Sequence, residues 1–159
     1  MPPSWPPDDF PNLNTDSCHV SSVATRQYNC IAWVAMENRR RWEPDPNLQY
    51  YWPPGVPREY AIAAVIKAYE SIGFRLCYSA VLEPGVQKLA LFGVTNQRGN
   101  IHPTHAALQL ACGNWTSKLG DFEDVVHRTP EDVNGPQYGE VVGYMARARP
   151  DPAIASYPR

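Results

Sequence analysis

The sequence predicts an α+β fold in which N-terminal helices pack on an antiparallel sheet. Apolar residues recur at helical spacing in two stretches of the first half of the chain, and short strand-like runs between turn signals fill the second half. The 159 residues suit one domain with one sizeable core. We therefore expect a single domain over residues 1–159, with the proline-rich segments 1–11 and 150–159 as extended tails.

The first predicted helix runs from residue 30 to about residue 42. Asn29 is a favourable N-cap, and Cys30 then takes the first helical position. Pro44 ends the helical stretch, because the residue before a proline avoids helical geometry. The apolar residues at helical spacing that form its buried face are Ile31, Val34 and Ala35.

A second helix is predicted from about residue 58 to residue 72, and Gly73 supplies its stop. The segment between the two helices is rich in proline and aromatic residues, and its exposed part, residues 50–54, is a candidate wall for a cleft. The apolar positions of the second helix recur at three- and four-residue steps at Ile62, Val65, Ile66, Tyr69 and Ile72.

Strand-like patterns replace the helical spacing after residue 73. A Pro-Gly turn at 83–85 and a Cys-Gly-Asn turn at 112–114 separate the runs, and the second turn predicts a hairpin. The order of helix, helix and then hairpin-connected strands favours an antiparallel sheet. The predicted strands cover residues 74–78, 87–94, 105–111, 115–119 and 137–145.

The charge and hydropathy of the chain exclude several classes of partner. A net charge of −2 gives no electrostatic footprint for nucleic acid. No segment is apolar over enough residues to span a bilayer, so we expect no membrane partner. The first residues lack the basic head and apolar run of a secretory signal, which makes the cytoplasm the default location and leaves signal-independent secretion open.

The four cysteines are expected to be free thiols, because nothing indicates an oxidising compartment. Cys18 and His19 are adjacent but have no second ligand pair at usable spacing, so we expect no metal site. The chain also lacks a glycine-rich phosphate loop, and no cofactor is expected.

Cys30 and His105 are the candidate catalytic pair. A cysteine attacks as the thiolate, and a helix N-terminus lowers the thiol pKa. An imidazole within hydrogen-bond reach would hold the thiol proton and later deliver it to the leaving amine. His105 opens a predicted strand, so its ring can project from the end of the sheet toward the start of the helix.

A third polar group would fix the tautomer of the imidazole. The strand after His105 offers Ser117, which we favour, and also Thr116 and Lys118. His102 is a rival base in the preceding loop. His127 is a rival orienting group if the segment after residue 119 folds back.

Stabilisation of an oxyanion would come from the backbone N–H of Cys30 and from a side-chain donor, either Tyr28 or Asn29. The sequence does not decide between these two. Trp115 is a further candidate for substrate contact, although a tryptophan in a strand is more often part of a core.

The order of these segments resembles the NlpC/P60 and CHAP branches of the papain-like cysteine hydrolases. The residues that carry the resemblance are Tyr28-Asn29-Cys30, then 83–94, then Thr104-His105-Ala106-Ala107-Leu108. The resemblance implies a polar third residue about a dozen positions after the histidine, where this chain has Ser117 instead of the usual His, Asn, Gln or Asp. More closely, the motifs YNCIAW, PTHAALQL and WTSKLG look like an uncharacterised bacterial domain family over residues 27–145.

Together the pair and the resemblance predict a papain-like cysteine peptidase or amidase. The resemblance implies a peptide or amide substrate, with peptidoglycan stem peptides as the leading candidate, and an inhibitor or immunity protein as a further partner. Acyl transfer and deamidation are close alternatives, because the same pair serves them. The alternative from another class is a binding module that keeps the fold without turnover.

Overall fold

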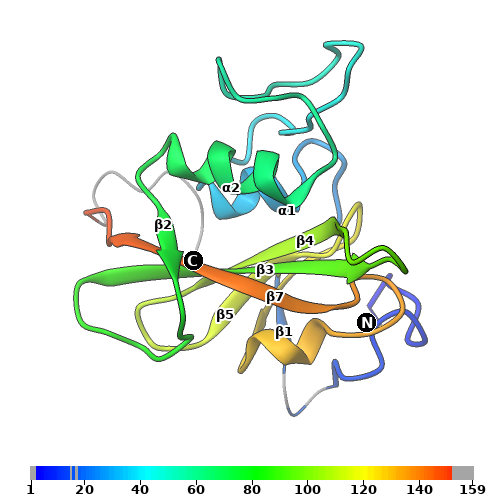
Figure 1. The fold of residues 1–159 in the computed structure, drawn as a ribbon. Coiled ribbons are helices and arrows are strands. Elements are labelled where there is room, and N and C mark those ends of the chain that lie inside the picture. The colour runs from blue at the N-terminus through cyan, green and yellow to red at the C-terminus, as the bar shows by residue number, and fades with distance from the viewer. Residues whose placement is uncertain (1–2, 15, 17, 152–159) are drawn as a thin grey trace.

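The computed structural model describes residues 3–14, 16 and 18–151, and its main element is a seven-stranded sheet (Figure 1). The spatial order of the strands is β1-β6-β5-β4-β3-β7-β2, and every neighbouring pair is antiparallel. The strands are β1 (Cys18–Ser22), β2 (Arg75–Cys77), β3 (Val86–Thr95), β4 (Ile101–Gln109), β5 (Trp115–Lys118), β6 (Asp124–His127) and β7 (Glu140–Ala148).

The predicted α+β class, with papain-like N-terminal helices, is wrong. In the described residues the helices are short: α1 covers Cys30–Val34, α2 covers Ile62–Glu70, and a 3-10 turn, η1, covers Pro130–Val133. The fold is therefore β-rich, and two of its strands, β1 and β6, lie in segments for which the sequence predicted no strand.

The early end of α1 explains much of this error. Met36 has a φ of 64°, and the Glu37 N–H donates to the Ala32 carbonyl at 2.9 Å, which closes the helix in a left-handed turn. A non-glycine residue in that conformation is uncommon, so no local sequence pattern marks the end of this helix. The predicted helix over residues 30–42 is thus one short turn followed by loop.

The second helix follows the sequence pattern more closely, although it is shorter than the predicted 58–72. Of the predicted apolar positions, Val65 and Tyr69 are buried, whereas Ile62, Ile66 and Ile72 are only partly buried against the core. Ala64 and Ala68 complete the buried face. Gly73 follows with a φ of 101°, a conformation that glycine adopts without a Cβ clash.

The two faces of the sheet bury separate apolar clusters. The helix-side cluster lies between the sheet and the two helices, which cover the same face in Figure 1, and includes Trp33, Tyr69, Leu91 and Leu108. The opposite cluster includes Ala90, Phe92, Trp115 and Val133. Adjacent strand residues fall in different clusters because their side chains alternate between the faces.

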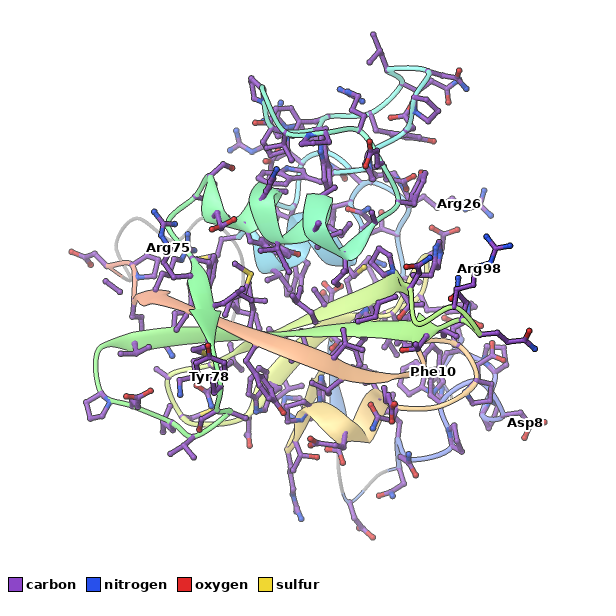
Figure 2. All side chains as sticks on the ribbon, viewed as in Figure 1. Asp8, Phe10, Arg26, Arg75, Tyr78 and Arg98 are labelled. Carbon is purple, nitrogen blue, oxygen red and sulfur yellow. The ribbon has the colours of Figure 1, made fainter. Side chains whose placement is uncertain are left out.

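The proline-rich start of the chain belongs to the opposite cluster. Trp5 is 7% exposed and Phe10 is 2% exposed, and Figure 2 shows Phe10 on the side of the sheet away from α2. Residues 3–11 therefore pack on the domain, whereas we expected an extended tail. Of the segment expected as a C-terminal tail, residues 152–159 lie outside the described residues.

The hairpin predicted at residues 112–114 is present between β4 and β5. The Leu110 N–H donates to the Asn114 carbonyl at 2.7 Å, which closes the turn. No described helix has the length and apolar character needed to cross a membrane.

Candidate active site

A cavity of about 290 Å³ opens at the start of α1, beside the middle of β4. Cys30 and His105 both line it, so the structure brings the two predicted catalytic residues to one site. Other parts of its wall come from the loop after α1, from the segment before β7 and from the turn after β5. The lining residues used below are Asn29, Arg41, Glu43, Ala106, Gly120 and Tyr138.

Cys30 is placed by the cap of its helix. The Asn29 side chain accepts the Ala32 N–H at 3.2 Å and the Trp42 N–H at 3.0 Å, and its amide donates to the Trp42 carbonyl at 2.7 Å. These three bonds hold the first turn of α1 against the loop that follows it. Cys30 retains partial exposure at the edge of the cavity.

The Cys30 sulfur reaches an opening between β4 and β5. These strands pair at Leu108–Thr116, and the alternation of an antiparallel ladder makes Ala106–Lys118 the next hydrogen-bonded pair. The strands do not pair there: the Lys118 carbonyl accepts the Gly120 N–H at 3.0 Å, and the Ala106 N–H acts on the Cys30 sulfur and favours its thiolate form. The sulfur thus lies near the backbone of Ala106, the residue that follows His105 in the chain.

Burial raises the pKa of the Cys30 thiol, and this outweighs the N–H groups of Ala106 and Ile31 and the Arg41 charge, which oppose it. The sequence predicted a lowered pKa from the helix N-terminus. Because α1 has only five residues, its dipole lowers the thiol pKa weakly, and the desolvation of the sulfur has the larger effect on that pKa. The resting sulfur is therefore a neutral thiol.

His105 lies on β4 with its ring on the opposite-cluster side. The ring contacts Phe92 with a centroid separation of 5.2 Å and stacks on Tyr138 at 3.9 Å, with an angle of 5° between the planes. The residue is 5% exposed. The two aromatic neighbours hold the imidazole plane in one orientation.

A chain of buried polar groups extends from His105 away from the cavity. His105 Nε2 lies 3.0 Å from Ser117 Oγ, which lies 2.8 Å from His127 Nε2. His127 Nδ1 lies 2.7 Å from the Thr129 carbonyl oxygen. Ser117 and His127 are 0% and 1% exposed, so the chain is sealed from solvent.

The donor and acceptor of each hydrogen bond in this chain can be assigned by starting from the Thr129 carbonyl. A carbonyl oxygen only accepts, so His127 Nδ1 carries a proton and donates it to Thr129. Burial lowers the pKa of His127, which is therefore neutral with a bare Nε2 that accepts from the Ser117 hydroxyl. The single hydroxyl proton of Ser117 is used in the bond to His127, so Ser117 Oγ must accept a hydrogen bond from His105 Nε2–H.

His105 is consequently the Nε2–H tautomer with an unprotonated Nδ1. Burial, and to a smaller extent repulsion from His127, holds the pKa of His105 well below its usual value, so the ring is neutral. Nδ1 is buried and has no hydrogen-bond partner in the described residues. No hydrogen bond joins the Cys30 thiol to either nitrogen of this ring in the described structure. The His105 ring therefore keeps one nitrogen lone pair that no described residue uses.

The side chains predicted to stabilise an oxyanion make other interactions in the structure. Asn29 uses its side chain in the helix cap, as described above, and the Tyr28 hydroxyl donates to the Asp124 carboxylate. Trp115 is 2% exposed and lies in the opposite cluster, away from the cavity lining. The structure brings none of the three side chains to the cavity as a free donor.

The rival residues also have other positions. His102 is exposed on β4, and Thr116 accepts a hydrogen bond from Trp33 Nε1 at 3.0 Å on the helix side. Lys118 donates to the Gly120 carbonyl at 2.9 Å and to the Phe122 carbonyl, which fixes the turn after β5. His127 reaches the site only through Ser117.

Sequence reasoning missed Tyr138 and the Arg41–Glu43 ion pair at 2.6 Å, which line the same cavity. No local pattern marks them, because the pairing of β7 with β3 and the loop after α1 bring them there. Among the described residues, no group of three or more His, Cys, Asp or Glu side chains has the arrangement of a metal site.

The molecule is thus a β-rich domain with a single sheet. Its cavity is lined by a cysteine and by the first histidine of a buried imidazole–hydroxyl–imidazole chain. The chain belongs to the family described as Domain of unknown function (DUF7689), whose model matches residues 19–146. No curated protein and no solved structure matches it. Nothing in these findings connects the chain with papain-like hydrolases.

Proposed function

We propose that this protein is a cysteine hydrolase of amide bonds, with Cys30 as the nucleophile and His105 Nδ1 as the base. One observation carries the proposal: His105 lines the same cavity as Cys30, and the His127–Ser117–His105 chain leaves its imidazole neutral with a bare, buried Nδ1. A fixed tautomer with a free lone pair is what a general base requires.

In the first step, the Cys30 sulfur attacks the amide carbonyl while its proton passes to His105 Nδ1. Because the thiol and the imidazole are both neutral at rest, the proton moves during the attack of the sulfur. In a preformed thiolate–imidazolium pair, the proton would have moved before the attack. The C–N bond of the tetrahedral intermediate then breaks, and His105 returns the proton to the leaving amine. The product is a thioester on Cys30.

In the second step, water attacks the thioester carbonyl and gives a proton to His105. The C–S bond breaks, the acid leaves, and His105 returns the proton to the Cys30 sulfur. Throughout, Ser117 stabilises the positive charge that forms on His105 by accepting from Nε2–H, and His127 orients Ser117.

The leading substrates are peptide amides, including the stem peptides of peptidoglycan. The cavity has apolar wall residues such as Ile31, Val65 and Pro103, and its volume of about 290 Å³ suits one amino-acid side chain with its flanking amide. An amine in place of the attacking water would give acyl transfer through the same thioester.

Turnover of purified peptidoglycan and of a peptide-amide library tests the proposal. We expect Cys30→Ala to abolish turnover and His105→Ala to reduce it about 10²- to 10⁴-fold. The matched controls are Cys112→Ala and His102→Ala, which change exposed residues outside the cavity and should leave turnover unchanged. Full turnover in a folded Cys30→Ala variant would overturn the proposal.

A binding module without turnover is the second candidate. The raised pKa of Cys30 and the lack of a hydrogen bond between its thiol and the His105 ring favour it, because a packing cysteine has the same properties. A ligand that saturates the cavity with equal affinity in wild type and Cys30→Ala, with no acyl adduct on Cys30 by intact mass, would support this alternative.

A further inference from the structure

The reaction proposed above needs a donor for the oxyanion of the tetrahedral intermediate, and the side chains first expected to supply it are occupied. The Tyr28 hydroxyl donates to Asp124, and the Asn29 amide donates to the Trp42 carbonyl. The donor must lie close to the Cys30 sulfur, because the oxyanion is two bonds away from that sulfur.

Tyr138 is the phenol that lines the cavity together with Cys30 and His105 in a buried position. It is 6% exposed, and its ring stacks on His105 at 3.9 Å. Tyr138 and Cys30 line the same cavity, and Cys30 is one of the groups that raise the pKa of the Tyr138 hydroxyl.

The backbone around Tyr138 fixes this ring independently of its hydroxyl. The Thr104 hydroxyl donates to the Tyr138 carbonyl, which ties the residue to β4. Gly139 follows with a φ of 69°, and a Cβ there would lie 2.4 Å from the Gly93 carbonyl oxygen on β3. The chain can therefore approach the sheet closely at this point, and this approach holds Tyr138 under His105.

The hydroxyl of Tyr138 has its proton available. The Gly120 N–H donates to the Lys118 carbonyl at 3.0 Å and also acts on the phenol oxygen, and as a donor it does not take up the O–H proton. No acceptor for this proton is present among the contacts of the described residues. Burial and the neighbouring Cys30 hold the pKa of Tyr138 well above its usual value, so the phenol remains a donor.

We propose that the Tyr138 hydroxyl donates to the oxyanion that forms on a substrate carbonyl during attack by Cys30. The assignment rests on the proposed hydrolase function. Tyr138 is then a catalytic residue, since its hydroxyl touches a reacting atom, and its ring also positions His105. Lys118 supports it by fixing the turn that carries Gly120.

The test compares Tyr138→Phe with wild type on a library of peptide p-nitroanilides, in which cleavage of the anilide bond releases a coloured amine. The phenylalanine keeps the stacked ring and removes only the hydroxyl. We expect kcat to fall about 10²- to 10³-fold with little change in KM, because the oxyanion exists only in the transition state and intermediate. Tyr144→Phe, on β7 and outside the cavity, should retain wild-type kcat.

Two measurements separate the ways in which this assignment can fail. Turnover that requires Cys30 but not the Tyr138 hydroxyl would overturn the role of Tyr138 alone. No turnover by wild type, or full turnover by Cys30→Ala, would remove the hydrolase function and this assignment with it. A change in the His105 tautomer of Tyr138→Phe, read by NMR, would show a positioning role only and would also overturn the donor assignment.

Discussion

The two faces of the sheet differ in what they bury. The helix side buries an apolar cluster, in which Trp33, Tyr69 and Leu108 pack between the sheet and the helices, and buried polar groups on that side, such as Thr116 and Asp124, bond to aromatic residues of the cluster. The opposite side buries apolar residues together with His105, Ser117 and His127. The helix side therefore supplies shape and stability, and the opposite side supplies an oriented polar chain.

The site lies where these two sides meet. Cys30 comes from the helix layer and His105 from the opposite side, and both line the cavity near which β4 and β5 stop pairing after Leu108–Thr116. If β4 and β5 paired along their full length, the Lys118 carbonyl would accept the Ala106 N–H and leave no space for the sulfur. In the proposed mechanism, this break in the ladder gives the sulfur its place beside β4.

The largest effect is expected on the helix side. Leu108→Ala removes a side chain that is 1% exposed and should lower the free energy of unfolding by about 2–5 kcal/mol. Chemical denaturation measures this loss. The His105 tautomer should persist in the folded fraction, since Leu108 faces away from that ring; a lost tautomer would contradict the separation of the two sides.

Gly139→Ala should have the next largest effect. The left-handed backbone costs an alanine about 1–3 kcal/mol, and the Cβ contact with the Gly93 carbonyl adds to that cost. The substitution should also displace Tyr138 from His105. Thermal unfolding and the aromatic ring-current shifts of His105 measure both effects, and a variant with unchanged stability would contradict the close approach of the Gly139 backbone to β3.

Ser117→Ala should lower the free energy of unfolding less than the two variants above and should lower turnover more. Both imidazoles lose a partner, which should lower the free energy of unfolding by about 1–3 kcal/mol. Turnover should fall further than with any stability-matched helix-side variant, because His105 loses its fixed tautomer. Ser117→Thr, which keeps the hydroxyl, is the control, and equal turnover in Ser117→Ala and wild type would contradict the role of the chain.

Acidification should weaken the opposite side selectively. His105 and His127 are neutral in the fold, and their pKa values lie below 6.5, the value expected for the unfolded chain. As the pH falls below 6.5, the unfolded chain binds more protons, so stability is lost by up to about 1.4 kcal/mol per pH unit for each histidine. Denaturation at pH 7 and pH 5 measures the loss, which should be smaller in His127→Gln; an equal loss in both proteins would count against a buried neutral His127.

Local sequence patterns predicted the local parts of this structure. The Asn29 cap, the start of α1 at Cys30, the buried face of α2 and the hairpin at 112–114 depend on neighbouring residues, and all four are present. The spacing of twelve residues that singled out Ser117 places its hydroxyl at His105 Nε2.

The remaining features depend on contacts between distant segments. The pairing of β1 with β6 joins residues about a hundred positions apart, and it was invisible in the composition of either strand. The left-handed Met36 shortened the predicted helix without any glycine signal. Tyr138 and His127 reach the site through the register of β7 and β6, which a single sequence does not specify.

The most direct test of the central claim is the protonation of His105 in the folded protein. Long-range proton–nitrogen NMR correlations at pH 7 distinguish the two neutral tautomers from the imidazolium, and His105→Gln assigns the signals. The account predicts a neutral ring with its proton on Nε2 and a bare Nδ1. A proton on Nδ1, or a cationic ring at that pH, would contradict it.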